Sequence, residues 1–394
     1  MPLEFVLFAL VLVGVALFHR RAFEVALAGL VAIALYKFAF TGFHGVPGVA
    51  GLLAHLAHEW VTLANLLCLL LGFALLSDHF EKSRVPAMLP RVLPDDWKGA
   101  FALLAIVFVL SAFLDNIAAA LIGGSIAHTV FQGRVHVGYL AAIVAASNAG
   151  GSGSVIGDTT TTMMWLDGIS PLAVDHAYMA AVPALFVFGI PAALKQHRHQ
   201  PIVKDAPRGA TLDWGRVAVV ASVLVVAIGV NVGVNVSIPE RAESFPFIGV
   251  AVALALLAAS ALRRPSWSLI PQSLRGTLFL LCLVTAATMM PVASLPAASW
   301  QTALGLGFVS AVFDNIPLTA LALEQGGYDW GVLAYAVGFG GSMLWFGSSA
   351  GVALSNMYPE ARSVGAWLRG GWPAALAYLV GFAVLMATLG WRPS

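Results

Sequence analysis

Charged residues are scarce in this sequence of 394 residues. Asp, Glu, Lys and Arg together make up 10% of it, whereas a soluble domain contains about 25%. So few charges exclude an ordinary soluble globular protein. The formal net charge is only +1, so the sequence lacks the basic surplus that is typical of nucleic-acid-binding proteins. We therefore expect no nucleic-acid partner.

Cysteine is also scarce, with Cys68 and Cys282 as the two examples. They lie far apart in sequence, each inside an apolar segment, where cysteine behaves as a small buried hydrophobe. Two such residues are too few for a disulfide framework and lack the spacing of a metal site. Redox chemistry and a bound cofactor are not expected.

What the sequence does contain is hydrophobic residues, at 60% of the total, in many runs of about 17–22 residues. A helix of that length crosses a hydrocarbon core about 30 Å thick. The first run ends in His19-Arg20-Arg21 without a small-residue cleavage site, so we interpret it as a spanning helix and not as a removed signal peptide. The sequence therefore predicts a polytopic helical membrane protein.

Two of the apolar segments contain an Asp-Asn pair near the middle, Asp115-Asn116 and Asp314-Asn315. Asp and Asn favour turns and helix caps over helix interiors. The pairs therefore predict re-entrant hairpins at about 100–131 and 300–325. The remaining segments predict about ten transmembrane helices, at 1–18, 22–40, 60–77, 137–165, 177–194, 217–237, 246–262, 277–297, 331–357 and 370–390.

The distribution of basic residues supports the two hairpins, because cytoplasmic loops are enriched in Lys and Arg. If each hairpin were a full crossing, the basic loop at 195–216 would lie outside, against this rule. With two hairpins, Arg241 and Arg392 lie outside and Lys37 lies within a span near its outer end. The seventeen other basic residues are then cytoplasmic: Arg20, Arg21, Lys82, Arg84, Arg91, Lys98, Arg134, Lys195, Arg198, Lys204, Arg208, Arg216, Arg263, Arg264, Arg275, Arg362 and Arg369.

The hairpin motifs belong to an internal repeat. The sequence SAFLDNI at 111–117 recurs as SAVFDNI at 310–316, with five of seven positions identical. A glycine-rich interruption follows each copy and predicts a broken helix, at about 137–165 and about 331–357. Because each half contains five crossings, the second half enters the membrane in the opposite orientation. The expected fold is thus an all-α polytopic membrane protein of two inverted-topology repeats, 1–200 and 201–394, as in many secondary transporters.

Polar residues gather at these breaks, where non-helical backbone at membrane depth must be buried in protein or line a wet cavity. Carboxylates at that depth cost about 2.5–3.5 kcal/mol each on an insertion scale, so Asp115, Asp158 and Asp314 are candidate Na⁺ and proton sites. Hydroxyl groups in the two breaks are supporting candidates: Ser152, Ser342, Ser348 and Ser349. Each candidate also has a purely structural alternative. The Asp-Asn pairs could form simple turns or helix caps, and the threonines at 159–162 could bond within their own helix. Ser348 and Ser349 could be small residues that allow close helix packing.

These motifs resemble the NhaD-type sodium/proton antiporters of the ion transporter superfamily, which also contains arsenite permeases and sodium-coupled dicarboxylate and citrate transporters. The resemblance covers about 100–165 and 305–355. It implies a homodimer in the lipid of the bacterial inner membrane, with a scaffold and a mobile transport domain in each protomer. The sequence SMLWF at 342–346 departs from the family pattern. Matched residue by residue to the motifs of this family, the resemblance also implies roles in cation transport for Ser111, Asp115, Asn116, Asn148, Asp158, Thr160, Thr161, Ser310, Asp314 and Asn315.

Three functions fit parts of this sequence. In the first, the three aspartates bind Na⁺ or Li⁺ when ionised and release it on protonation, so the protein exchanges these cations for H⁺ by an elevator-like movement. In the second, the protein imports citrate, a dicarboxylate or another anion with sodium, although carboxylates at both hairpin tips would repel it. In the third, the protein is an intramembrane protease. Its catalytic motif would be either GGSG at 150–153, for a serine protease that needs His128 as base, or Gly157-Asp158, for an aspartyl protease. The first is favoured, which makes the protein a transporter and not an enzyme.

Overall fold

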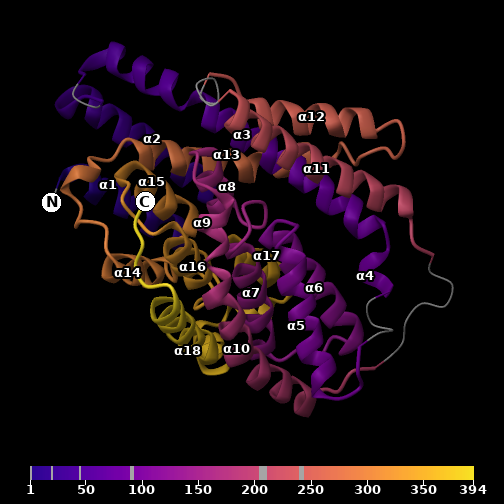
Figure 1. Ribbon diagram of the computed structural model, residues 1–394. Helices are drawn as coiled ribbons and strands as arrows, with labels where there is room; N and C mark the ends of the chain where they lie inside the picture. Colours follow the sequence, from indigo (N-terminus) through magenta and orange to yellow (C-terminus); the bar gives the residue numbers. More distant parts are fainter. Residues whose placement is uncertain (1, 19–20, 44–45, 89–92, 204–210, 239–243) are drawn as a thin grey trace.

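The computed structural model describes residues 2–18, 21–43, 46–88, 93–203, 211–238 and 244–394. The basic residues Arg20, Arg91, Lys204, Arg208 and Arg241 lie outside this part of the chain. Across the described ranges the regular structure is helical, and no β-strand is present (Figure 1). The α-helices are α1 (Leu3–Leu17), α2 (Ala22–Tyr36), α3 (Gly48–Lys82), α4 (Val85–Met88), α5 (Trp97–Ser111), α6 (Asn116–Val130), α7 (Val137–Ser152), α8 (Thr159–Leu166), α9 (Pro171–Asp175), α10 (Tyr178–His199), α11 (Trp214–Ser237), α12 (Phe247–Ala259), α13 (Leu269–Thr288), α14 (Trp300–Ser310), α15 (Asn315–Gln325), α16 (Trp330–Gly340), α17 (Ser349–Met357) and α18 (Val364–Thr388).

Several helical segments are long and apolar enough to cross a membrane. Among the described residues there are five of them: Ala22–Thr41, Gly48–Lys82, Pro171–His199, Leu269–Thr288 and Val364–Thr388. Shorter apolar helices accompany them, including α5, α6, α12 and α16. These lengths and compositions identify a multi-pass membrane protein, as the sequence predicts.

Two helices differ in extent from the sequence expectation. The segment expected at 60–77 is part of the 35-residue helix α3, which begins at Gly48 and includes the polar residues at 55, 58 and 59. His55 is buried there, and its Nε2 lies 3.2 Å from the hydroxyl of Thr288. The segment expected at 277–297 is α13, which begins eight residues earlier and ends before Pro291. Polar side chains inside helices misled the hydropathy pattern in both cases.

The sequence places Lys37 near the outer end of a membrane span. In the structure its side chain is buried, in a short π-helix at Lys37–Thr41 that follows α2. Its Nζ donates a hydrogen bond of 2.7 Å to the carbonyl oxygen of Met289 at the end of α13. Helix carbonyls at a C-terminus lack partners within the helix, and a cation there is favourable. Lys37 therefore connects α2 to α13.

Each Asp-Asn pair lies at a break between two helices. α5 ends at Ser111 and α6 begins at Asn116, and in the second half α14 and α15 are separated in the same way. The carboxylate of Asp115 accepts a hydrogen bond of 2.9 Å from the backbone N–H of Ile117, and Asp314 accepts one of 3.1 Å from Ile316. The helix breaks predicted at both pairs are confirmed, and each Asp caps the helix that follows it.

The two glycine-rich interruptions also break helices. α7 ends at Ser152 and α8 begins at Thr159, while α16 and α17 are separated by residues 341–348. Asp158 caps α8 through a 2.9 Å hydrogen bond from the N–H of Thr160. Ser348 caps α17 through a 3.3 Å hydrogen bond from the N–H of Gly351. Both interruptions thus end in a side-chain cap, a carboxylate in one half and a hydroxyl in the other.

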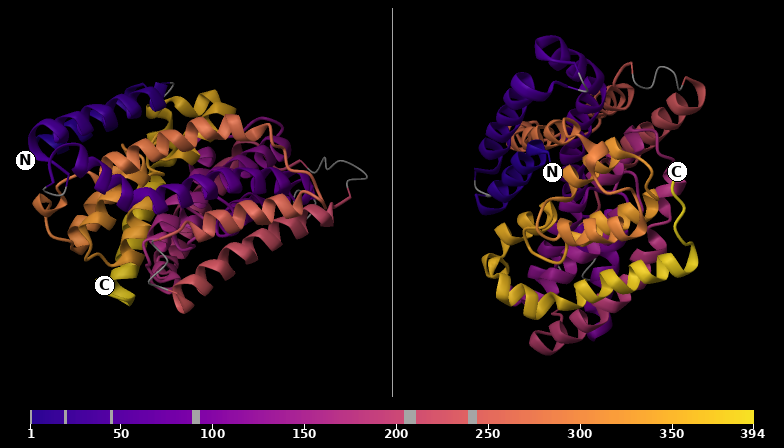
Figure 2. Two further views of the ribbon diagram at one scale, coloured as in Figure 1. Left: turned by 90° about the horizontal axis from the view of Figure 1, so that it is seen from above. Right: turned by 90° about the vertical axis from the view of Figure 1, so that its left-hand side faces the viewer.

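The helices form two groups, which Figures 1 and 2 show from three directions. One group contains α1, α2, α3, α11, α12 and α13. In this group α1 packs against α2, both α2 and α3 pack against α13, and α11 and α12 pack against α3 and against each other. The other contains the helix pairs around the four breaks together with α10 and α18. Helices α3 and α13 contact α6, α8 and α15 and so lie at the boundary between the groups. The helix pairs with the breaks therefore lie against the first group through α3 and α13.

Close backbone contacts hold each broken helix against the first arm of its hairpin. A Cβ atom at Gly150 would lie 1.9 Å from the carbonyl oxygen of Phe108 in α5. A Cβ atom at Gly340 would lie 2.2 Å from the carbonyl oxygen of Gly307 in α14. Contacts this short require glycine, because backbone atoms cannot move aside as a flexible side chain can. The same packing is therefore used in both halves.

We expect Gly150→Ala to destabilise the protein by about 1–3 kcal/mol, the usual effect of overpacking a tightly packed interior. Gly305→Ala in α14 is the matched control, because a Cβ atom there has no neighbour within 4 Å. Thermal melting of the purified proteins in detergent measures the difference. Equal melting temperatures for the two variants would contradict the packing described here.

Candidate functional site

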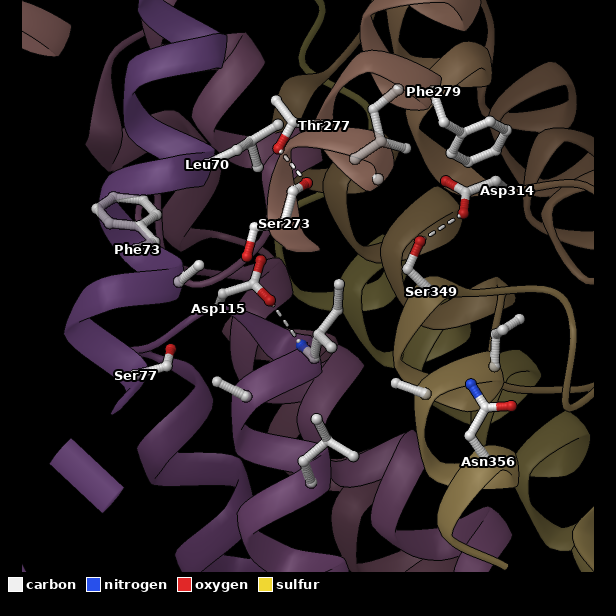
Figure 3. A pocket seen from close by; sticks show the side chains of 18 of the residues that line it. Leu70, Phe73, Ser77, Asp115, Ser273, Thr277, Phe279, Asp314, Ser349 and Asn356 are labelled. Carbon is white, nitrogen blue, oxygen red and sulfur yellow. Dashed lines mark hydrogen bonds between the residues drawn. The ribbon is translucent and has the colours of Figure 1, made fainter. Parts of the chain in front are cut away.

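A cavity of about 790 Å³ lies between the two groups of helices. Its walls come from α3 and α13 on one side and from both hairpins and α17 on the other (Figure 3). Asp115 and Asp314 both line it, and Figure 3 shows them on separate walls, at the two hairpin tips. Most of the remaining lining is apolar, including Phe73 and Phe279. The carboxylates of both hairpin tips are thus presented to one largely apolar cavity, which Asp78 and Glu81 of α3 also line.

Asp158 lies deeper than these two residues and is 1% exposed. Its Oδ1 accepts hydrogen bonds of 2.9 Å from both the backbone N–H and the hydroxyl of Thr160. Its Oδ2 accepts a hydrogen bond of 2.8 Å from Nδ2 of Asn116. A buried carboxylate is tolerated only when hydrogen bonds replace its water, and these donors do so.

Asn315 donates to the same carboxylate from the other half of the chain. Its Nδ2 lies 3.4 Å from both oxygens of Asp158. Asn116 and Asn315 occupy corresponding positions of the repeated motif, one residue after the capping aspartate. Asp158 therefore joins the two hairpin tips through their asparagine side chains.

Asn148 makes a second connection between the halves. Its Oδ1 accepts a hydrogen bond of 3.2 Å from Asn116, and its Nδ2 donates to the hydroxyls of Ser342 and Ser348 at 3.0 and 3.1 Å. The side chains of Asn148, Ser342 and Ser348 are fully buried. Six of the candidate residues predicted from the sequence thus belong to one hydrogen-bonded network with Asp158: Asn116, Asn148, Thr160, Asn315, Ser342 and Ser348.

The two hairpin-tip carboxylates have different neighbours. Asp314 accepts a 2.8 Å hydrogen bond from the hydroxyl of Ser349, which Figure 3 shows next to it across the break. Asp115 has no corresponding side-chain donor among the hydrogen bonds of the described residues. Its carboxylate accepts a hydrogen bond from the backbone N–H of Ile117, at the N-terminus of α6. The hairpin tips are therefore alike in backbone and unlike in the polar groups around their carboxylates.

A second cavity, of about 10 Å³, is bounded by Asp115, Asp158 and Thr159 together with apolar side chains of α3. A space of this size suits a single water molecule or a dehydrated ion. Asp115 lines both cavities, whereas Asp314 lines only the large one and Asp158 only the small one. Asp115 therefore stands between the large cavity and the buried carboxylate.

The three aspartates do not form one ligand shell in this conformation. Within the ranges that the structure describes, no three Asp, Glu, His or Cys side chains lie close enough together to hold one metal ion. A cation bound at Asp158 would instead draw its other ligands from amide, hydroxyl and carbonyl oxygens, which are suitable ligands for hard cations.

Other candidate hydroxyls bond to nearby backbone. The Thr161 hydroxyl donates to the carbonyl oxygens of Ser154 and Asp158, and that of Ser152 donates to Ala149. Ser310 donates to the carbonyl oxygen of Val337. Ser111 is fully buried near the first break, and its hydroxyl has no hydrogen-bond partner in the described structure. These residues support the breaks and do not contact the Asp158 carboxylate.

The arrangement also counts against the protease hypothesis. The hydroxyl of Ser152 is engaged with its own helix, and His128 is exposed near the end of α6 with its ring against Tyr358. A serine nucleophile requires a base within hydrogen-bond reach. Ser152 and His128 show no such pairing.

The sequence analysis missed the wall that α3 and α13 contribute to the large cavity. Ser77 of α3 and Ser273, Gly276 and Thr277 of α13 line it. The last three lie on one face of α13, because positions three and four apart are neighbours on a helix. The helical spacing of these small and polar residues could have predicted this wall. It was missed because the expected segment began at 277, after Ser273 and Gly276.

We expect Asn148→Ala to destabilise the protein by about 1–3 kcal/mol, because it removes a buried side chain that hydrogen-bonds to three others. Thermal melting in detergent measures the loss. Ser355→Ala in α17 is the control, because that buried hydroxyl bonds only to Val352 of its own helix. A loss no larger than that of the control would contradict the connection between the halves.

Comparison with known proteins supports the resemblance of the motifs. No protein-family model matches the chain. Sodium/proton antiporter 1 of Arabidopsis thaliana is 27% identical over 341 residues, which cover 73% of this chain and 53% of that relative. The Na(+)/H(+) antiporters NhaD of Alkalimonas amylolytica and Vibrio parahaemolyticus are 28% and 26% identical, over 63% of this chain and 60% and 71% of their own lengths.

The chain thus spans about half the length of the first of these relatives. The matches nevertheless extend well beyond the repeated motifs, and the plant relative and the two bacterial relatives are all named as sodium/proton antiporters. Together with the paired helix breaks, they support the resemblance of this chain to the NhaD-type sodium/proton antiporters.

Proposed function

We propose that this protein exchanges Na⁺ or Li⁺ for H⁺ across a membrane. The observation that carries the proposal is the buried carboxylate of Asp158, which receives hydrogen bonds from the asparagines of both hairpin tips. Such a group has two stable partners, a proton and a small cation, and cannot hold both. The names of the relatives support the same exchange.

The amide side chains around Asp158 suit both states of the exchange. An asparagine amide presents two N–H donors on one side and a carbonyl oxygen on the other. In the structure, the N–H groups of Asn116 and Asn315 point at the carboxylate. When a cation binds, rotation of an amide turns its carbonyl oxygen to the ion. The site can thus change from a donor set to a ligand set without moving the backbone.

The hairpin-tip carboxylates of Asp115 and Asp314 serve the path to this site. Both face the large cavity, whose volume far exceeds that of a bare ion and leaves room for hydrating water. A hydrated cation entering the cavity meets Asp115, which also borders the ion-sized space next to Asp158. We assign to Asp115 and Asp314 the capture of the cation, and to Asp158 the exchange with the proton.

The paired hairpins and broken helices form the moving part in this proposal. They correspond to each other in two repeats of opposite orientation, and they lie against the group α1–α3 and α11–α13, which serves as the scaffold. Inverted repeats with sites at broken helices support alternating access. Asp78 and Glu81 line the large cavity at the end of α3 that we assign to the cytoplasm, so this conformation is open inward. The mobile protomer works as one half of a homodimer in the bacterial inner membrane.

Anion transport fits the cavity less well. Four carboxylate side chains line it, those of Asp78, Glu81, Asp115 and Asp314, and none of the residues that line it in the described structure is Lys or Arg. A citrate or dicarboxylate would therefore meet repulsion without a basic partner to offset it. The cavity favours a cation.

We expect proteoliposomes containing the protein to show Na⁺- or Li⁺-dependent proton movement, detected by dequenching of a pH-sensitive dye. Asp158→Ala should abolish the exchange, because in the described part of the chain no other carboxylate accepts hydrogen bonds from both hairpin asparagines. Asp115→Ala and Asp314→Ala should raise the cation concentration needed for half-maximal rate.

A control for folding accompanies each variant, because truncated aspartates also lose a helix cap. Elution as a single species in detergent identifies the folded ones. Sodium-dependent uptake of labelled citrate or succinate, with no proton movement on addition of Na⁺ or Li⁺, would replace the proposal with anion symport.

The proposed orientation can be tested with cysteine labelling in a variant that lacks Cys68 and Cys282. A cysteine at position 199, the last residue of α10, should react with an impermeant maleimide only in everted vesicles. A cysteine at position 293, after α13, should react only in intact cells. Labelling of both positions from one side would rule out the inverted arrangement.

A further inference from the structure

The large cavity and the ion-sized space next to Asp158 are separate, and the residues that line both of them form the partition between them. Besides Asp115, these residues are Leu70 and Phe73 of α3. Figure 3 shows both side chains on α3, on the wall of the large cavity where Asp115 also lies. The partition thus consists of one carboxylate from a hairpin tip and two apolar side chains from the group that we assign to the scaffold.

One face of α3 borders both spaces, and its character changes along its length. Positions three and four apart lie on the same face of a helix. The residues of this face that line the ion-sized space are Leu66, Leu69, Leu70 and Phe73. Those that continue it along the large cavity include Ser77, Asp78 and Glu81. Polar side chains are therefore accommodated on this face where the cavity is wide, and the face is apolar where it borders the space next to Asp158.

The polar lining of the ion-sized space comes from the opposite group of helices. It consists of the carboxylates of Asp115 and Asp158 and the hydroxyls of Thr159 and Thr162. The four residues of α3 that line this space have hydrocarbon side chains, which cannot coordinate an ion or hydrogen-bond to water. An ion there would take its ligands from one side and meet only carbon on the side of α3.

The sizes of the two spaces determine where a cation loses its water. The large cavity, of about 790 Å³, accommodates an ion together with hydrating water. The small one, of about 10 Å³, accommodates a single water molecule or a bare ion. A hydrated ion is therefore stopped at Leu70 and Phe73. An ion passes only when the oxygens of Asp115 and Asp158 replace its water.

We propose that Phe73, together with Leu70, determines ion selectivity by closing the space next to Asp158 to hydrated cations and to cations larger than Na⁺. The inference rests on the proposed exchange function. It assigns part of the ion selection to the scaffold helix α3 and to a side chain that does not coordinate the ion. Li⁺ and Na⁺ fit beside the phenyl ring, whereas K⁺, the larger ion, requires the volume that the ring occupies.

The chain offers a matched control for the phenyl ring. Phe279 of α13 also lines the large cavity, but it does not line the ion-sized space. Removing either ring enlarges the large cavity, and only Phe73→Ala also opens the ion-sized space to it. Phe73→Leu keeps an apolar side chain at the partition. Comparing these variants separates the partition from simple packing.

The first measurement is the cation dependence of proton movement in proteoliposomes. In Phe73→Ala, we expect the ratio of the half-maximal K⁺ concentration to the half-maximal Na⁺ concentration to fall at least about tenfold, because pockets discriminate by size to at least this extent. Phe73→Leu should lower this ratio less. Phe279→Ala should leave the ratio as it is in the wild type.

The second measurement reports the partition without transport. In a variant that lacks Cys68 and Cys282, Thr159→Cys places a thiol in the ion-sized space. The reagent is 2-aminoethyl methanethiosulfonate, a small cation, applied to the protein in detergent. Adding Phe73→Ala should speed its reaction with this thiol at least about tenfold, because cysteine reactivity depends on access. Adding Phe279→Ala should not speed it.

Equal ion ratios and equal reaction rates in Phe73→Ala and Phe279→Ala would overturn the inference, because packing alone would then explain the ring. If Phe73→Ala does not elute as a single folded species, Leu70→Ala tests the same partition, and no change in either measurement would overturn the inference. Absence of cation-dependent proton movement in the wild type would overturn the proposed function and the selectivity role with it. The thiol reaction would still decide whether Phe73 separates the two spaces.

Discussion

The structure depends on one buried negative charge and the hydrogen bonds that make its burial possible. Asp158 is 1% exposed in a chain of apolar helices, where an isolated carboxylate is expensive. Its oxygens are reached by a helix N-terminus, a threonine hydroxyl and two asparagine amides. These donors come from three different breaks in the helical chain. The breaks position the carboxylate of Asp158, and they also supply the hydrogen-bond donors without which it could not be buried.

Helix ends supply the rest of the local order. All four second segments, α6, α8, α15 and α17, begin with a side-chain cap, provided by Asp115, Asp158, Asp314 and Ser348. Each cap satisfies backbone donors that hydrocarbon would leave without partners. The alternative interpretation of the Asp-Asn pairs, a cap without a ligand, is thus correct about their local role. It does not account for the two carboxylates facing one cavity, which a cap alone does not need.

Sequence patterns could locate the breaks because Asp, Asn and glycine-rich strings are local signals with local causes. The hairpin arms and both interruptions lie where the repeat predicts them. The network around Asn148 could not be predicted, because Ser342 and Ser348 are about 200 residues away and their contact depends on how the halves pack. The cavity wall was missed for another reason. A helix such as α13 that faces water on one side is less apolar than a lipid-facing helix, so hydropathy places its start too late.

The residues at the second break show that the two halves share a backbone arrangement and not a set of polar groups. Where the first half has a carboxylate at 158, the second has the hydroxyl of Ser348. Ser348 accepts a hydrogen bond from Asn148, which in turn accepts one from Asn116, the partner of Asp158. A carboxylate at position 348 would therefore lie in the same buried network as Asp158, and two buried carboxylates so close together repel each other. A repeated backbone can thus build both walls of the network, while the side chains that differ between the halves leave Asp158 as its carboxylate.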